Sequence, residues 1–258
     1  MINTKHTHYI HPKTISSPSA YHRDFSGKTL SLSMPNSKSL FKIKDPGSAI
    51  THFIAMIAAI CAAPFLLIRA ASTHDILHIF SLAVFIFTMI ALYAASTNYH
   101  TFDVSPKINE RLKKADHMMI SIMIAGSYTP VCLLVIGGHK GLVLCISVWL
   151  FAIAGILIKA FWIYCPKWFS SILYIGMGWM CIFAFSDIYR TLTQSAFLWL
   201  LIGGIFYTVG GVIYSIKMPR FNQNHPNFGT HEIFHLFVMG GSFCHYILMY
   251  QFLAVFPN

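Results

Sequence analysis

Long apolar stretches recur along the chain, separated by short segments that carry most of its charged residues. About 20 apolar residues in a helix cross a hydrocarbon core of about 30 Å. Stretches of this kind predict membrane-spanning helices, so we expect an all-α fold, a seven-transmembrane helix bundle. The predicted spans are residues 49–68, 76–95, 118–136, 142–158, 170–185, 195–216 and 233–256.

The composition agrees with this pattern. The chain is 56% hydrophobic and only 10% charged, which excludes an ordinary soluble domain. Its net charge of +10 would suggest nucleic acid in a soluble protein, but here the basic residues follow the ends of the spans. Membrane lipids are therefore the expected partners, and nucleic acid is not.

The placement of lysine and arginine predicts the orientation in the membrane. Fifteen of the 18 lie in the N-terminal segment and in the loops after spans two, four and six, and only Arg69, Lys140 and Arg190 lie in the alternate loops. Basic residues favour the cytoplasmic side. We therefore expect a cytoplasmic N-terminus and a C-terminus outside.

Residues 1–47 form a basic segment before the predicted membrane domain of residues 48–258. The segment lacks the apolar run of a secretory signal, and we expect a poorly ordered cytoplasmic tail. The six cysteines are scattered, and all but Cys165 fall inside predicted spans. No pair has the spacing of a zinc knuckle, so we expect the cysteines to pack as small apolar residues.

Four unusual polar residues fall at the same predicted depth. His100 follows span two, Asp116 precedes span three, and His231 and His235 stand at the start of span seven. The orientation given above places all four at the cytoplasmic face. His231 and His235 are four residues apart, so a helix carries both on one face. Ionisable groups near a bilayer core are costly and usually mark a site.

These residue types point to a metal centre. Three neutral imidazoles with one open position are the ligand set of a catalytic zinc, whose fourth ligand is water. We therefore predict zinc held by His100, His231 and His235. Asp116 would act as a general base on the water, and Ser96, one turn before His100, would orient a ligand or donate to an oxyanion.

Other residues are weaker candidates. His52 begins span one at the same face, where a supporting role and a packing role are both open. His245 lies about 15 Å beyond His235 at about 1.5 Å per residue and is expected to line the interior or bond another helix. His117 points away from Asp116 and is not expected to be a ligand. Glycines at seven-residue spacing in span six, namely Gly203, Gly204, Gly210 and Gly211, predict close helix packing.

Several motifs together resemble a known family. They are Ser96 with His100, Asp116-His117 leading to residues 125–130 (Ala-Gly-Ser-Tyr-Thr-Pro), Gly178-Trp179-Met180, and His231 with His235 followed by His245. With these motifs the chain resembles the haemolysin III branch of the progestin and adiponectin receptor superfamily. The resemblance implies a multi-pass protein of the bacterial inner (plasma) membrane.

The resemblance also implies a site. In that family zinc is held by the histidines that match His100, His231 and His235, and the aspartate that matches Asp116 contacts the metal through water. The family is similar to alkaline ceramidases, which implies hydrolysis of a lipid amide. On this basis the leading hypothesis is a zinc-dependent hydrolase of an amide or ester bond in a lipid-like substrate.

Three alternatives remain open. One is a receptor-like regulator of membrane state with a structural zinc, and another is a pore-forming haemolysin. The third arises because Glu232 turns the histidine pair into His-Glu-x-x-His, the signature of zinc proteases, in which the glutamate is the general base. The competing explanation for Glu232 is a carboxylate in the first turn of a helix, where the macrodipole favours it.

Overall fold

The computed structural model describes residues 21–23, 29–31, 43–216, 218–225 and 228–257. The chain divides into two compact units, residues 1–41 and residues 42–258. Within the first unit, β1 (Tyr21–Arg23) pairs antiparallel with β2 (Thr29–Ser31), and Tyr21 lies opposite Ser31. The predicted tail of residues 1–47 falls largely outside the described residues and stays a prediction.

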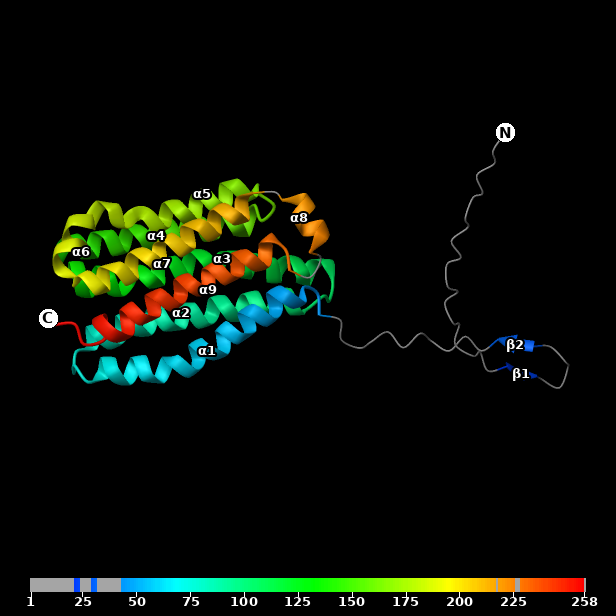
Figure 1. The fold of residues 1–258 in the computed structure, drawn as a ribbon, viewed down its shortest axis with the longest axis horizontal. Helices are drawn as coiled ribbons and strands as arrows, with labels where there is room; N and C mark the ends of the chain where they lie inside the picture. Colours follow the sequence, from blue (N-terminus) through cyan, green and yellow to red (C-terminus); the bar gives the residue numbers. More distant parts are fainter. Residues whose placement is uncertain (1–20, 24–28, 32–42, 217, 226–227, 258) are drawn as a thin grey trace, which may run out of the picture. The chain divides into compact units, whose positions relative to one another are not determined.

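The second unit consists of helices (Figure 1). Seven of the segments in its described part are long and apolar enough to cross a membrane, which confirms the seven predicted spans. The long helices are α1 (Pro46–Ala71), α2 (Ile76–Thr101), α3 (Pro106–Pro130), α4 (Gly138–Phe161), α7 (Gln194–Ser215) and α9 (Thr230–Leu248). The shorter ones are α5 (Lys167–Gly178), α6 (Phe185–Thr191) and α8 (Pro219–Asn224).

Side-chain caps fix where several helices begin. Asp75 accepts a hydrogen bond from the Leu77 N–H at 3.0 Å before α2, and Thr193 accepts one from the Ala196 N–H at 3.3 Å before α7. Ser105 precedes α3, whose first residue is proline. Such caps satisfy N–H groups that the first turn leaves free. Because α3 begins directly after Ser105, it starts well before the apolar run, and Asp116 lies inside the helix.

Three spans are irregular. After Pro130, α3 continues as a π-helical segment, Val131–Ile136, and a turn at Gly137 and Gly138 then leads into α4. Both glycines have positive φ, at +62° and +54°, which a residue with a Cβ rarely adopts. Span five is divided by a 3₁₀ segment, Trp179–Ala184, which joins α5 to α6. A second π-helical segment, Met249–Leu253, extends α9.

The helices pack as a closed ring. The most extensive contacts are between α2 and α3, α7 and α9, and α1 and α2, and α1 also packs on α9 while α5 packs on α7. Helices distant in sequence are thereby neighbours, as α1 and α9 are.

Glycines in α7 allow the close approach of α9, as their spacing predicted. A Cβ added to Gly203 would lie 2.3 Å from the His245 ring, and one added to Gly210 would lie 2.9 Å from Phe237. Gly211 faces Ile175 of α5 instead, and a Cβ on Gly204 would meet no atom within 4 Å. The repeat thus consists of two packing positions on α9, one on α5, and one open position.

Candidate metal centre

Three histidines from two helices meet at one end of the bundle. His100 lies in the last turn of α2, and His231 and His235 lie in the first turns of α9. One ring nitrogen from each falls within 4.8 Å of the others, so the cluster can hold a metal ion. The Nε2 atoms of His100 and His231 are 3.3 Å apart. The structure thus brings together the three histidines singled out from the sequence.

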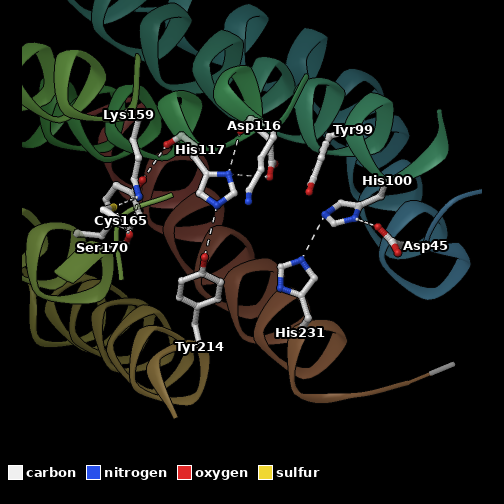
Figure 2. A network of polar contacts seen from close by, with 12 residues as sticks. Asp45, Tyr99, His100, Asp116, His117, Lys159, Cys165, Ser170, Tyr214 and His231 are labelled. Carbon is white, nitrogen blue, oxygen red and sulfur yellow. Dashed lines mark hydrogen bonds and ion pairs between the residues drawn. The ribbon is translucent and has the colours of Figure 1, made fainter. Parts of the chain in front are cut away.

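Asp45, immediately before α1, fixes the orientation of His100. The His100 Nδ1–H donates to the Asp45 Oδ2 over 3.0 Å, so Nε2 faces the cluster (Figure 2). The backbone holds Asp45 in place, because its N–H donates to the His100 carbonyl at 2.9 Å. This carboxylate–histidine arrangement is common behind metal ligands. The sequence does not single out Asp45, because this residue lies in a segment with no apolar period or motif.

The cluster is buried and incompletely hydrogen-bonded. His100 and His235 are each 2% exposed, and the His235 Nδ1 has no hydrogen-bond partner among the described residues. The ring of His52, from α1, stacks on His235 with the ring centroids 3.6 Å apart. Both of its nitrogens are also buried without a partner in the described part of the chain. His52 therefore supports the His235 ring but lies outside the three-residue cluster.

Asp116 and Ser96 lie inside the bundle with the histidines. Both are buried, and both line the same cavity as His231 and His235. His117 lies outside the cluster. Contrary to the expectation, it does not point away from Asp116, because its Nδ1 lies 3.5 Å from the Asp116 Oδ2. Its Nδ1–H donates to the Lys113 carbonyl at 2.9 Å, and its Nε2 lies 3.4 Å from the Tyr214 hydroxyl (Figure 2). It nevertheless lines the cavity, which the sequence did not indicate.

Glu232 is engaged in holding the start of α9. Its Oε1 accepts a hydrogen bond from the Ser48 hydroxyl at 2.7 Å, and its Oε2 accepts one from the Gly229 N–H at 2.8 Å. The first bond ties α9 to α1, and the second satisfies a free N–H at the helix terminus. With both oxygens occupied in this way, Glu232 is not placed as the base of a zinc protease.

A cavity of about 690 Å³ extends from His231 and His235 into the bundle. Its lining comes from α1, α2, α3, α5, α6, α7 and α9 and is mostly apolar. It includes both His231 and His245, which are 14 residues or about 21 Å apart along α9 at about 1.5 Å per residue. His245 thus lines the interior, and its Nε2 lies 3.4 Å from the Leu200 carbonyl. The volume falls in the usual range for ligand sites, about 300–1,000 Å³.

These features define a class, a multi-pass helical membrane protein with a histidine cluster at one end of an internal apolar cavity. Comparison with known proteins gives the family. The chain belongs to the haemolysin III family, because the protein-family model described as "Haemolysin-III related" matches residues 41–246. The matched range includes Asp45 and the whole histidine cluster.

Individual relatives agree with this assignment. The chain is 36% identical over 204 residues to the Hemolysin-3 homolog of Bacillus subtilis (strain 168), covering 79% of this chain and 92% of that protein. It is 36% identical over 202 residues to Hemolysin-3 of Bacillus cereus, covering 78% and 88%. An adiponectin receptor protein of Drosophila melanogaster is 21% identical over 245 residues, covering 81% and 51%. The relatives support the wider superfamily and a place in the bacterial plasma membrane.

Proposed function

We propose that this protein is a zinc-dependent hydrolase that cleaves an amide or ester bond in a membrane lipid. The observation that carries the proposal is the continuity of the histidine cluster with a long apolar cavity. A metal-ligand set alone is compatible with a structural ion. A metal-ligand set that opens into a chamber for an acyl chain favours chemistry on a lipid.

The three histidines fit a zinc ion. Imidazole nitrogen is a preferred zinc ligand, and three such ligands leave the fourth position open. His235 carries a buried nitrogen without a partner among the described residues, which is costly unless a ligand binds there. Asp45 holds the His100 hydrogen on Nδ1 and so leaves the Nε2 lone pair available. A zinc ion held by these residues would supply an activated water as the nucleophile.

The remaining polar residues have complementary roles in the proposal. Asp116 accepts the proton from the attacking water as a general base, a role worth about 10²–10⁴-fold in rate. Ser96 donates its hydroxyl hydrogen to the oxygen that becomes negative when the carbonyl is attacked. Asp45 acts as a positioning residue through His100. His52 keeps the His235 ring in place by stacking.

The cavity decides which part of the substrate enters the bundle. Apolar side chains of α3, α7 and α9 line its length, so an acyl chain can move there from the bilayer without exposing its apolar surface to water. The carbonyl at the end of that chain would then lie next to the histidines. Orientation by a remote chain of this kind lowers the barrier by holding reacting groups in place.

The decisive test measures lipid cleavage with the metal content known. The purified full chain would be incubated with an N-acyl sphingoid base or a diacyl phospholipid in detergent micelles. We expect free fatty acid to be released from at least one of them, activity to stop after chelation, and zinc to restore it. Zinc-loaded protein that releases no fatty acid from either class would overturn the hydrolase.

The names of the relatives supply two competing functions. The receptor relative favours a regulator with a structural zinc, in which the metal is present but no lipid is cleaved. The haemolysin relatives favour a pore, but the cavity is lined mostly by apolar side chains, unlike an aqueous channel. Liposomes loaded with a fluorescent dye distinguish the pore, because only a pore releases the dye without lipid cleavage.

A further inference from the structure

A second buried polar cluster lies where α4 ends and α5 begins. Lys159 stands in the last turn of α4, Cys165 in the connecting segment, and Ser170 in the first turn of α5. They are 1%, 8% and 1% exposed. Figure 2 shows the cluster beside His117, apart from His100 and His231. None of the three lines the cavity or belongs to the proposed metal centre.

The three side chains are in direct contact. The Lys159 Nζ lies 3.0 Å from the Cys165 Sγ and 2.5 Å from the Ser170 Oγ. The Sγ and Oγ atoms are 3.4 Å apart. Within the described part of the chain, no carboxylate forms an ion pair with Lys159. Lysine is almost never fully buried unless it is paired, so packing alone does not account for an amine held against a thiol.

We propose that Lys159 and Cys165 form a covalent N–O–S bridge on reaction with dioxygen. One N–H bond of the amine and the S–H bond of the thiol break, and an N–O and an O–S bond form. One oxygen atom of O₂ becomes the bridge, and the other leaves as water with the two hydrogens. Nitrogen and sulfur together lose four electrons, which dioxygen gains.

The surroundings favour this reaction over other fates of the thiol. Ser170 holds the amine against the sulfur, so the two reacting atoms are already adjacent. A thiol that is 8% exposed is poorly accessible to glutathione or to a second protein. Dioxygen is small and apolar, and it dissolves readily in a hydrocarbon environment. The bridge would attach the end of α4 to the segment that leads into α5.

The test is peptide mass spectrometry on the full-length protein, purified in detergent either in air or without oxygen. Trypsin cuts after a free lysine, so a bridged Lys159 resists cleavage. In air we expect residues 141–167 to appear as one uncut peptide that has gained one oxygen and lost two hydrogens. Dithiothreitol should restore both cleavage after Lys159 and alkylation of Cys165. Without oxygen, cleavage and alkylation should be complete from the start.

Matched variants identify the atoms involved. Cys165→Ser should abolish the mass change and restore cleavage after Lys159, whereas Cys145→Ser, in the same peptide, should leave the bridge intact. A disulfide between Cys145 and Cys165 would lose two hydrogens without gaining oxygen. Wild-type protein in air that is cut after Lys159, or that carries a disulfide or an oxidised thiol instead, would overturn the proposal.

Discussion

The two ends of α2 each hold a buried histidine next to an aspartate, and the two histidines differ in one respect. At the start of the helix, the His78 Nδ1 lies 2.8 Å from Asp75 Oδ2 and its Nε2 lies 3.0 Å from the Phe256 carbonyl. At the other end, the His100 Nδ1 contacts Asp45, but its Nε2 faces another imidazole. Both ring nitrogens of His78 thus contact oxygen acceptors of the protein. In His100 only Nδ1 does so, and Nε2 is available to bind a ligand.

This difference separates a histidine that holds the fold together from one that belongs to a site. Burial and an acidic partner are common to both, so neither property identifies function. What distinguishes the two histidines is the group that the second ring nitrogen contacts. His78 ties α2 to the residues after α9, while His100 faces His231, which lines an apolar cavity.

The largest expected effect is loss of metal. His235→Ala should abolish zinc binding, because only two of the three imidazoles remain. His78→Ala should keep its zinc but lower the unfolding temperature, because Asp75 and the Phe256 carbonyl lose their donor. Elemental analysis and thermal unfolding of the purified variants measure both. Equal zinc content in His235→Ala and wild type would show that His235 is not a zinc ligand. It would also contradict the distinction between a site histidine and a structural one.

The next effect concerns the proposed base. Asp116→Asn should lower the rate of fatty-acid release by about 10²–10⁴-fold with zinc content unchanged, because the carboxylate is not one of the three clustered ligands. The matched control is Asp187→Asn, which removes a carboxylate that pairs with Lys140 at the surface. The control should retain full activity. A zinc-loaded Asp116→Asn protein with wild-type turnover would contradict the role.

The two aspartates of α2's ends can be compared directly. Asp45→Asn should weaken zinc binding by about 10–100-fold, the usual cost of losing the group behind a ligating histidine. Asp75→Asn should leave zinc affinity unchanged and reduce stability alone. Competition with a chromophoric chelator gives the affinities. If both substitutions changed zinc affinity equally, Asp45 would have no specific positioning role.

The smallest effect concerns His245, the buried histidine at the far end of the cavity. Gly203→Ala should destabilise the protein by about 1–3 kcal/mol, because the added methyl would lie 2.3 Å from the His245 ring. Gly204→Ala has open space and should leave stability unchanged or raise it by up to about 1 kcal/mol, because alanine is favoured over glycine inside a helix. Neither should change zinc content. Thermal unfolding of the pair is the measurement, and equal stability would show that α9 moves to accommodate the methyl.

The sequence predicted the spans well because a bilayer imposes a length and a polarity on every helix. It predicted the histidine cluster because charge bias, once converted into topology, placed segments from opposite parts of the chain at one depth. The orientation itself stays a prediction. The 3₁₀ break inside span five was not predicted, since a 3₁₀ segment arises from packing and leaves no hydrophobic period.

The sequence also did not predict three features of the site, for a different reason. They are the contact of Asp45 with His100, the stacking of His52 on His235, and the cavity. Each depends on the side chains of several helices meeting in space, and no single segment carries a pattern for it. Glu232 is the converse case, a motif match without the matching geometry. Its spacing matches a protease motif, yet its two oxygens hold Ser48 and Gly229.

The separation of His100 and His231 by 131 residues sets the order of events during synthesis. At about 5–20 residues per second, roughly 7 to 26 seconds pass between the two histidines leaving the ribosome. Because His231 and His235 lie on one helix, two of the three proposed ligands arrive together and last. If zinc binds as proposed, it does so only after the seventh span has docked, and a bound ion would report that assembly of the bundle is complete.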